Sequence, residues 1–118
     1  MVRIAAVRDA EQLGVLNDEF NGKGETTIDG IRNSIVNNKQ EVVIVDDENG
    51  VLVGFVCVQL KKSFCYDEYM PEITEVYVNP MYRKKGIAPR ALYKKFGFKE
   101  AELIEEFGYP NQKFVLYP

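Results

Sequence analysis

The sequence predicts a single α/β domain (α+β) over residues 1–118, with a mostly antiparallel central sheet flanked by helices. Three observations support this fold class. Two N-terminal segments carry apolar residues at helical spacing, and three strand-like apolar segments follow in the middle of the chain. A basic, glycine-containing turn then precedes a further helical segment. With 118 residues, of which 46% are hydrophobic, the chain is long enough to bury one core.

The N-terminal part is expected to form a short strand, residues 3–7, and then a helix. Asp9 is expected to cap this helix and Gln12 to complete a capping box. Apolar residues at helical spacing form its expected buried face: Leu13, Leu16 and Phe20. Residues 21–24, Asn-Gly-Lys-Gly, should end it.

A second helix is expected to begin at Thr26 or Thr27 and to end near residues 37–38, Asn-Asn. Its expected buried residues are again at helical spacing: Ile28, Ile31 and Ile35.

Three strands of the sheet are expected at residues 41–45, 51–60 and 73–78. Asn49-Gly50, between the first two, is typical of a tight hairpin turn. Residues 51–60 are apolar on both alternating faces, which indicates a central strand covered on both sides. Pro71 is expected to introduce the third strand.

The C-terminal part is expected to hold one helix and two strands. Residues 81–86 are expected to form a basic turn, and Pro89 stands where a first helical residue is favoured. This helix should run to Phe96. Residues 99–107, for which a helix is the alternative, and residues 113–117 are the two final strands.

Composition excludes several classes of protein. A net charge of −3 argues against a duplex nucleic-acid binder, and the longest apolar run, residues 51–60, is too short to span a bilayer. Because histidine is absent, Ser–His and Cys–His nucleophilic pairs and histidine metal sites are excluded, and no metal is expected. Acid–base work is left to Glu, Asp, Tyr, Lys or Cys. Cys57 and Cys65 are expected to be reduced thiols in a cytoplasmic protein.

A basic loop between a strand and a helix is the first candidate binding site. In that position backbone N–H groups converge on one point and meet the positive end of the helix dipole, so they can hold a phosphate. Gly86 leaves room for the anion, and neighbouring side chains add positive charge. The residues of this loop are Arg83, Lys84, Lys85, Gly86, Ile87 and Ala88. The alternative is a solvated basic turn.

Two motifs resemble the GNAT N-acetyltransferase superfamily. Residues 72–88, Glu-Ile-Thr-Glu-Val-Tyr-Val-Asn-Pro-Met-Tyr-Arg-Lys-Lys-Gly-Ile-Ala, resemble its coenzyme A segment. Residues 91–98, Ala-Leu-Tyr-Lys-Lys-Phe-Gly-Phe, resemble its Leu-Tyr-x-x-x-Gly-Phe motif. The order of strand, two helices and three antiparallel strands before residue 79 is also similar to this fold. The resemblance covers nearly the whole chain.

The resemblance implies acetyl-CoA as co-substrate and assigns residues to it. Amides along Val76, Tyr77 and Val78 would pair with the pantetheine arm and polarise the acetyl carbonyl. Amides of residues 83–88 would hold the pyrophosphate. Tyr93 matches the tyrosine that protonates the departing thiolate; the alternative is a helix tyrosine packed on the core.

Two glutamates are candidates for the base that accepts a proton from the incoming amine. Glu72 lies eleven residues before Arg83, as the catalytic glutamate does in some members of the superfamily. Glu75 is the other, expected on the opposite face of the strand. Either could act through a water, and the alternative for each is an exposed carboxylate. The preceding loop, where family members often recognise the acceptor, contains Tyr66, Asp67, Glu68 and Tyr69; its alternative is a plain solvated loop.

The chain departs from the superfamily after the basic loop. Only three residues separate Ala88 from Leu92, so one helix and one strand are expected to be missing. Strand 73–78 would then have an open edge, covered either by the final strands or by a second copy of the chain. A homodimer, with exchange of C-terminal strands as one route, is the expectation.

The expected function is acetyl transfer to a primary amine of a small molecule or peptide, with no nucleic-acid or membrane partner. A non-catalytic or weakly active CoA-binding protein is the first alternative. A protein that keeps the fold and binds no nucleotide is the second.

Overall fold

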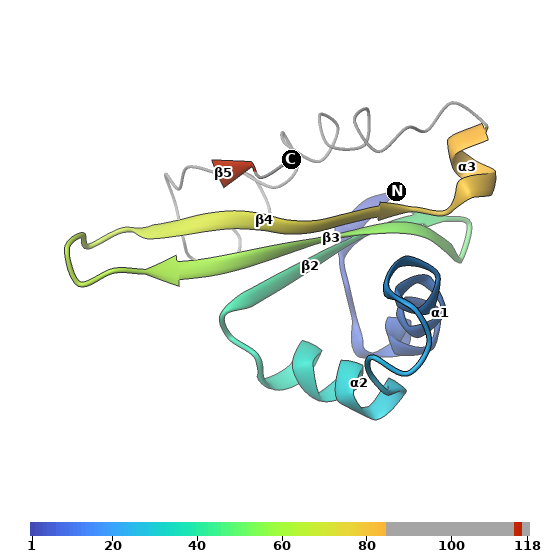
Figure 1. Ribbon diagram of the computed structural model, residues 1–118, viewed down its shortest axis with the longest axis horizontal. Helices are drawn as coiled ribbons and strands as arrows, with labels where there is room; N and C mark the ends of the chain where they lie inside the picture. Colours follow the sequence, from blue (N-terminus) through green and yellow to red (C-terminus); the bar gives the residue numbers. More distant parts are fainter. Residues whose placement is uncertain (85–114, 117–118) are drawn as a thin grey trace.

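The computed structural model describes residues 1–84 and 115–116, and it confirms the expected mixed, mostly antiparallel α/β fold (Figure 1). The sheet has the order β1-β2-β3-β4-β5, with β1 to β4 antiparallel and β5 parallel to β4. The strands are β1 (Val2–Ile4), β2 (Glu41–Glu48), β3 (Val51–Lys62), β4 (Tyr69–Val78) and β5 (Val115–Leu116). The helices are η1 (Val7–Asp9), α1 (Ala10–Asn21), α2 (Ile28–Asn37) and α3 (Pro80–Lys84).

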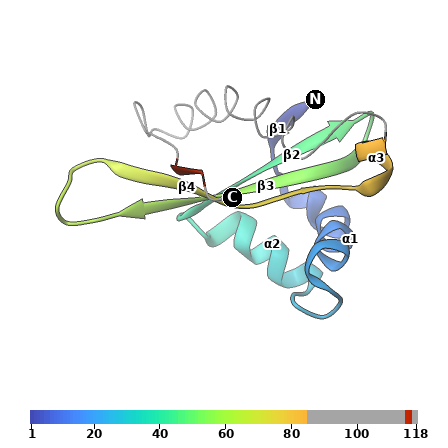
Figure 2. The same ribbon diagram turned by 45° about the horizontal axis from the view of Figure 1, so that its top comes forward.

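Helices α1 and α2 lie together on one face of the sheet (Figures 1 and 2). The sheet therefore has a helix-facing side, with its own core cluster: Ala5, Leu13, Leu16, Val45, Leu52, Phe55 and Tyr77. The opposite side carries a second cluster: Val42, Ile44, Val56, Val58, Leu60, Ile73 and Val78. Strand β3 contributes to both, so its prediction as a central strand is confirmed.

The β2–β3 hairpin also forms as predicted. Asn49 and Gly50 both have positive φ angles, 56° and 91°, as a tight two-residue hairpin turn requires. Both strands are longer than expected: β2 continues to Glu48, and β3 begins at Val51 as predicted but continues to Lys62, where it pairs with β4.

The predicted capping box at the start of α1 is wrong. The Asp9 carboxylate accepts hydrogen bonds from Arg3 and from the Ala6 amide instead of capping α1. Gln12 reaches the β2–β3 hairpin, where its amide donates to the Gly50 carbonyl (3.0 Å) and accepts from the Leu52 amide (2.8 Å). Both side chains therefore join α1 to the sheet, because tertiary partners compete successfully with local capping.

The buried faces of the two helices are only partly as predicted. Leu13 and Leu16 are buried, but Phe20 is 39% exposed and packs against Phe55 and Tyr77 at ring-centroid distances of 6.0 and 5.3 Å. Thr27 caps α2, within the predicted range. In α2, Ile28 is 41% exposed, and none of its residues is fully buried. Helix α2 is thus packed less tightly on the sheet than the periodicity predicts.

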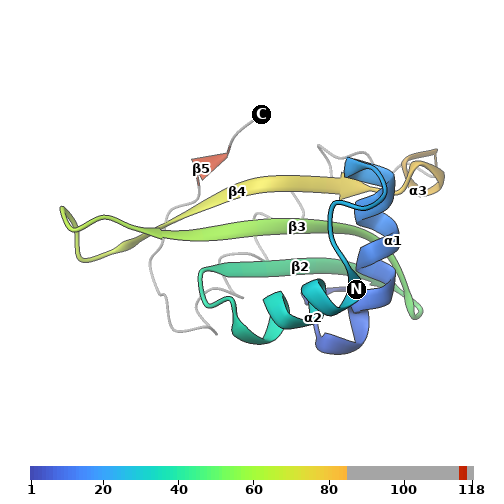
Figure 3. The same ribbon diagram turned by 60° about the horizontal axis from the view of Figure 1, so that its bottom comes forward.

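Strand β4 begins earlier than predicted and contains Pro71. It starts at Tyr69 and pairs with β3 out to Lys62, while the pairing of β2 with β3 ends at Gln59. The β3–β4 hairpin therefore projects beyond the rest of the sheet, as Figure 3 shows.

Residues 81–84 belong to helix α3, not to the predicted basic turn. Residues 85–114 lie outside the described part of the chain. The predicted helix 89–96, the predicted strand 99–107 and the predicted loss of one helix and one strand therefore stay predictions. Within the predicted strand 113–117, β5 forms and pairs with Glu72 and Ile73 of β4. The final strand therefore covers part of the edge of β4. The homodimer stays a prediction.

Candidate functional site

The helix-facing side of the sheet changes from apolar to polar along its strands. Three rows of residues, each in register across β2, β3 and β4, show this change: Val45–Phe55–Tyr77, then Val43–Cys57–Glu75, then Glu41–Gln59–Glu72. The first row lies in the core under α1. The last row carries two carboxylates and one amide. We therefore expect residues that take part in acid–base catalysis at this polar end of the face.

A β-bulge in β4 brings both candidate bases to this face. Glu72 pairs with Gln59, and Glu75 pairs with Cys57, so three steps along β4 correspond to two along β3. Thr74 is the extra residue. Since Cys57 and Gln59 are two residues apart, they share one face, and their partners share it too. The prediction that Glu75 lies on the face opposite Glu72 is therefore wrong, because it assumed a regular strand.

A chain of hydrogen bonds orients the carboxylates of Glu41 and Glu75. The Gln59 amide donates to Glu41 Oε2 (2.6 Å) and to Thr74 Oγ1 (3.3 Å), and the Thr74 hydroxyl donates to Glu75. Glu41 on β2 and Glu75 on β4 are thus held on either side of β3.

Glu72 has a different environment, because its carboxylate forms an ion pair with Lys61 Nζ. Its negative charge is already balanced by a cation on the neighbouring strand. Among the described residues, Glu75 has only the Thr74 hydroxyl as a hydrogen-bond partner. Of the two candidates, Glu75 is therefore the carboxylate better placed to accept a proton from a new ligand.

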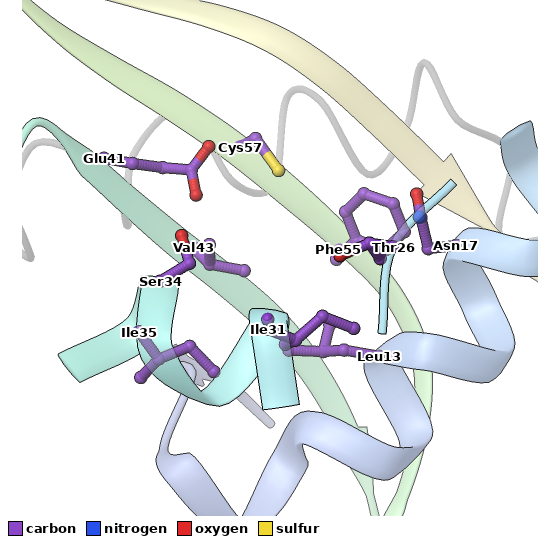
Figure 4. A pocket seen from close by; sticks show the side chains of 11 residues that line it. Leu13, Asn17, Thr26, Ile31, Ser34, Ile35, Glu41, Val43, Phe55 and Cys57 are labelled. Carbon is purple, nitrogen blue, oxygen red and sulfur yellow. The ribbon is translucent and has the colours of Figure 1, made fainter. Parts of the chain in front are cut away.

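A cavity of about 180 Å³ lies between this face, α1 and α2 (Figure 4). Its lining residues are Leu13, Asn17, Thr26, Gly30, Ile31, Ser34, Ile35, Glu41, Val43, Phe55 and Cys57. Glu41 and Cys57 lie next to one another at one end, with Leu13, Ile31 and Ile35 on the helix side. The loose packing of α2 leaves this space.

Cys57 is not suited to nucleophilic catalysis. Burial raises the pKa of its thiol well above the ordinary value, and the negative charges of Glu41 and Glu75 raise it further. The thiol is therefore protonated at neutral pH, whereas a nucleophilic cysteine needs the thiolate. Both cysteines are free, as predicted.

The residues assigned to the cofactor are described only in part. Val76, Tyr77 and Val78 end β4 and pair with Val56, Phe55 and Gly54. Arg83 and Lys84 are the last residues of α3. Four loop residues and the candidate acid lie outside the described residues: Lys85, Gly86, Ile87, Ala88 and Tyr93. Their roles remain predictions.

Asn79 connects the end of β4 to both α1 and α3. Its side-chain oxygen accepts a hydrogen bond from the Met81 amide (2.9 Å), which caps α3. Its side-chain nitrogen donates to Glu19 of α1 (3.2 Å), and the same carboxylate accepts from the Tyr77 hydroxyl (3.3 Å). Asn79 therefore sets the direction in which the chain leaves β4 toward the predicted anion loop.

Replacing Asn79 with alanine is expected to weaken acetyl-CoA binding and to lower the free energy of unfolding by about 1 kcal/mol, since a helix cap is lost. Asn79→Ser keeps an oxygen that can cap α3 and should recover most of the stability. Urea unfolding and calorimetric titration with acetyl-CoA measure the two effects. Unchanged cofactor affinity in Asn79→Ala would show that α3 does not align the loop.

The loop expected to recognise the acceptor lies away from this cavity. Tyr66 is exposed in the loop between β3 and β4, and Tyr69 packs against the cluster on the opposite side of the sheet. The role of Tyr66, Asp67, Glu68 and Tyr69 therefore stays a prediction. Sequence reasoning missed Glu41, Gln59 and Thr74. The predicted two-residue turn pairs Glu48 with Val51, and a regular register from there would have placed Glu41 opposite Val58. The register shift between Asp46 and Asp47 places Glu41 opposite Gln59 instead.

Over residues 1–84 and 115–116, no three His, Cys, Asp or Glu side chains lie close enough together to hold a metal ion. In the same part of the chain, every helix is too short or too polar to cross a membrane.

The fold of this chain is similar to the folds of several solved acetyltransferase structures. The Brucella melitensis ribosomal-protein-alanine N-acetyltransferase superposes with a TM-score of 0.71 at 20% identity, covering 100% of this chain and 79% of that one. A Trypanosoma brucei acetyltransferase gives 0.73 at 17% identity, covering 100% and 82%. Glucosamine-6-phosphate N-acetyltransferase from Arabidopsis thaliana gives 0.70 at 15% identity, covering 100% and 81%. A search of curated protein sequences found no match.

These structures are only distantly similar in sequence, so they establish the acetyltransferase fold and nothing further about this chain. The sequence is more specific: the profile of the Acetyltransferase (GNAT) family matches residues 15–96. The chain belongs to the GNAT acetyltransferase family.

Proposed function

We propose that this protein transfers an acetyl group from acetyl-CoA to a primary amine of a small molecule or peptide, by direct attack of the amine in a ternary complex. The observation that carries this proposal is the bulge at Thr74. It holds the Glu75 carboxylate on the helix-facing side of β4, next to the strand segment that the family resemblance assigns to the thioester.

The proposed reaction needs one base and one acid. Glu75, directly or through a water, accepts a proton from the ammonium group, and the neutral amine attacks the acetyl carbonyl. The amides of residues 76–78 stabilise the negative charge on the carbonyl oxygen. The carbon–sulfur bond then breaks, and Tyr93 gives a proton to the departing thiolate. The attacking nitrogen loses its second proton to the resulting tyrosinate, and Glu75 returns the first proton to solvent. The products are an N-acetylated amine and coenzyme A. The protonated state of Cys57 supports direct attack over an acetyl-cysteine intermediate.

Two measurements test the proposal in order. Acetyl-CoA at 100 times its Kd should stabilise the fold by about 2.7 kcal/mol, visible as a rise in Tm. Thiol release should then require an amine, which a panel of amines at fixed acetyl-CoA concentration would show. A rise in Tm with no amine-dependent thiol release would instead support a CoA-binding protein without catalysis.

Tyr93→Phe is expected to lower kcat by at least about tenfold and to leave the Kd for acetyl-CoA nearly unchanged, because only the proton donor is removed. Stopped assays of thiol release give kcat, and calorimetric titration gives Kd. Normal turnover by Tyr93→Phe would reject tyrosine as the acid.

The second candidate function is CoA binding with weak or no catalysis. It is favoured by one observation, the three-residue separation of Ala88 from Leu92, from which we expect one helix and one strand of the superfamily fold to be missing. We propose in addition a cytoplasmic homodimer with no nucleic-acid or membrane partner; light scattering behind a sizing column tests the dimer.

A further inference from the structure

We infer that the acceptor is a primary amine bearing a compact apolar group, and that the cavity between the sheet, α1 and α2 binds this group. The inference rests on the proposed function, because it names the substrate class of the same site. The ammonium group lies at the Cys57 end, between Glu41 and Glu75. The apolar group extends toward Leu13, Ile31 and Ile35.

The size of the cavity limits the apolar group. Cavities of about 150 Å³ lined by leucine, isoleucine and phenylalanine side chains bind benzene. The present cavity, at about 180 Å³, accepts a group similar to a six-membered ring or a branched alkyl chain. This limit applies to the part of the acceptor that enters the cavity.

The lining of the cavity selects apolar over polar groups. Carbon-rich side chains come from both helices and the sheet: Leu13, Ile31, Ile35, Val43 and Phe55. Asn17, Thr26 and Ser34 also line the cavity and can bind a polar group, but a hydroxyl group held against the five apolar side chains would lose its hydrogen bonds to water. An apolar group placed there gains from leaving water.

The charges at one end select an ammonium group. Glu41 lines the cavity beside Cys57, and Glu75 is the cross-strand partner of Cys57. The Gln59–Thr74 chain fixes both carboxylates before any ligand arrives, so little ordering is needed on binding. No described lysine or arginine lines this cavity, and Lys61 pairs with Glu72 in the next row. A carboxylate-bearing or neutral ligand is correspondingly disfavoured.

The position of the ammonium group also fits the reaction. A nitrogen held beside Glu75 lies next to the bulge of β4, and residues 76–78 follow directly along the strand. The carboxylate that attracts the ammonium is then the one that takes its proton.

Cys57 supplies a readout that does not depend on turnover. In a Cys65→Ser background, Cys57 is the only thiol, and its rate of alkylation by iodoacetamide reports whether the cavity is occupied. The measurement is made at about pH 8.5, where an ordinary thiol is half ionised. Because the pKa of Cys57 is raised by burial and by the neighbouring carboxylates, its alkylation is expected to be slow even without ligand. Three probes are compared: cyclohexylmethylamine, its neutral analogue cyclohexylmethanol, and 1,4-diaminobutane.

Cyclohexylmethylamine is expected to protect Cys57 saturably, and the two other probes to bind at least about tenfold more weakly. Glu41→Gln should reduce the preference for the amine over the alcohol. Ser34→Leu, which places an apolar side chain in the cavity, should abolish protection by any probe. Asn33→Leu adds the same side chain at an exposed position of α2 and should leave protection unchanged.

Equal protection by the amine and the alcohol, or protection that persists in Ser34→Leu with a normal Tm, would overturn the inference. The proposed function is tested separately by thiol release. If 1,4-diaminobutane supports acetyl transfer and cyclohexylmethylamine does not, the inferred substrate class is wrong and the proposed function stands. If cyclohexylmethylamine protects Cys57 but no amine releases thiol, the cavity is confirmed as an amine site and the proposed function is wrong.

Discussion

Replacing Glu75 with glutamine is expected to lower kcat about 100-fold at neutral pH, because the amide cannot take the proton of the ammonium group. Glutamine keeps the shape of the side chain and can still accept the hydrogen bond from Thr74. Stability and acetyl-CoA affinity should therefore change little. Steady-state measurement of kcat, with Kd from calorimetry, separates the chemical step from binding.

Glu72→Gln is the matched control for this prediction. Glu72 shares the face of Glu75, but Lys61 already pairs with its carboxylate. Its replacement should change kcat by no more than a few-fold. The pH profile adds a further readout, since the limb that reports the base should disappear in Glu75→Gln and persist in Glu72→Gln. The reverse pattern would assign the base to Glu72.

Asp9→Asn is expected to lower the free energy of unfolding by about 3 kcal/mol at neutral pH, as removal of one partner from a buried ion pair does. Asp9 is 3% exposed, and the Arg3 guanidinium donates to both of its oxygens, at 2.7 and 2.8 Å. Arg3 also pairs with Asp47, so the asparagine variant leaves a cation with half of its balancing charge. Urea unfolding measures the difference.

The stability lost in Asp9→Asn should decrease as the pH is lowered. The hydrogen bonds from Arg3, with that from the Ala6 amide, hold the pKa of Asp9 below its usual value. The contribution of Asp9 is therefore fully present above the pKa of the unfolded chain, about 3.9, and is lost as the pH falls through the lower folded value. The difference in the free energy of unfolding between the wild type and Asp9→Asn should therefore become smaller as the pH falls below about 4.

Asp29→Asn provides the comparison for this second prediction. Asp29 pairs with Arg32 at 2.9 Å on the exposed surface of α2, where its side chain is 92% exposed. Surface pairs contribute about 0–1 kcal/mol, so this variant should unfold nearly as the wild type does. A loss as large as that of Asp9→Asn would mean that burial does not set the strength of the Arg3–Asp9 pair.

Local signals in the sequence predict much of the fold. Asn49-Gly50 predicts the hairpin because its backbone conformation suits few other residues, and the two-sided apolar pattern of residues 51–60 predicts a central strand. The capping box failed because Arg3, a tertiary partner, takes the Asp9 carboxylate. Such competition between distant residues has no signature in local spacing.

The candidate site could be predicted only in part for a similar reason. Sequence analysis identified both glutamates, but strand alternation placed them on opposite faces, because a bulge adds a residue without a distinctive motif. The cavity was also missed. It depends on how closely α2 packs against the sheet, and helical periodicity indicates only which residues face inward.

The hydrogen bonds between Glu19 and Asn79 connect the helix beside the cavity to the start of the segment proposed to bind acetyl-CoA. Glu19 lies on α1, which also supplies Leu13 to the cavity, and Asn79 fixes the start of α3. A ligand in the cavity that displaces α1 also displaces the hydrogen-bond partner of Asn79. Under the proposed function such coupling is reciprocal: acetyl-CoA would change the affinity for the amine by the same factor as the amine changes the affinity for acetyl-CoA.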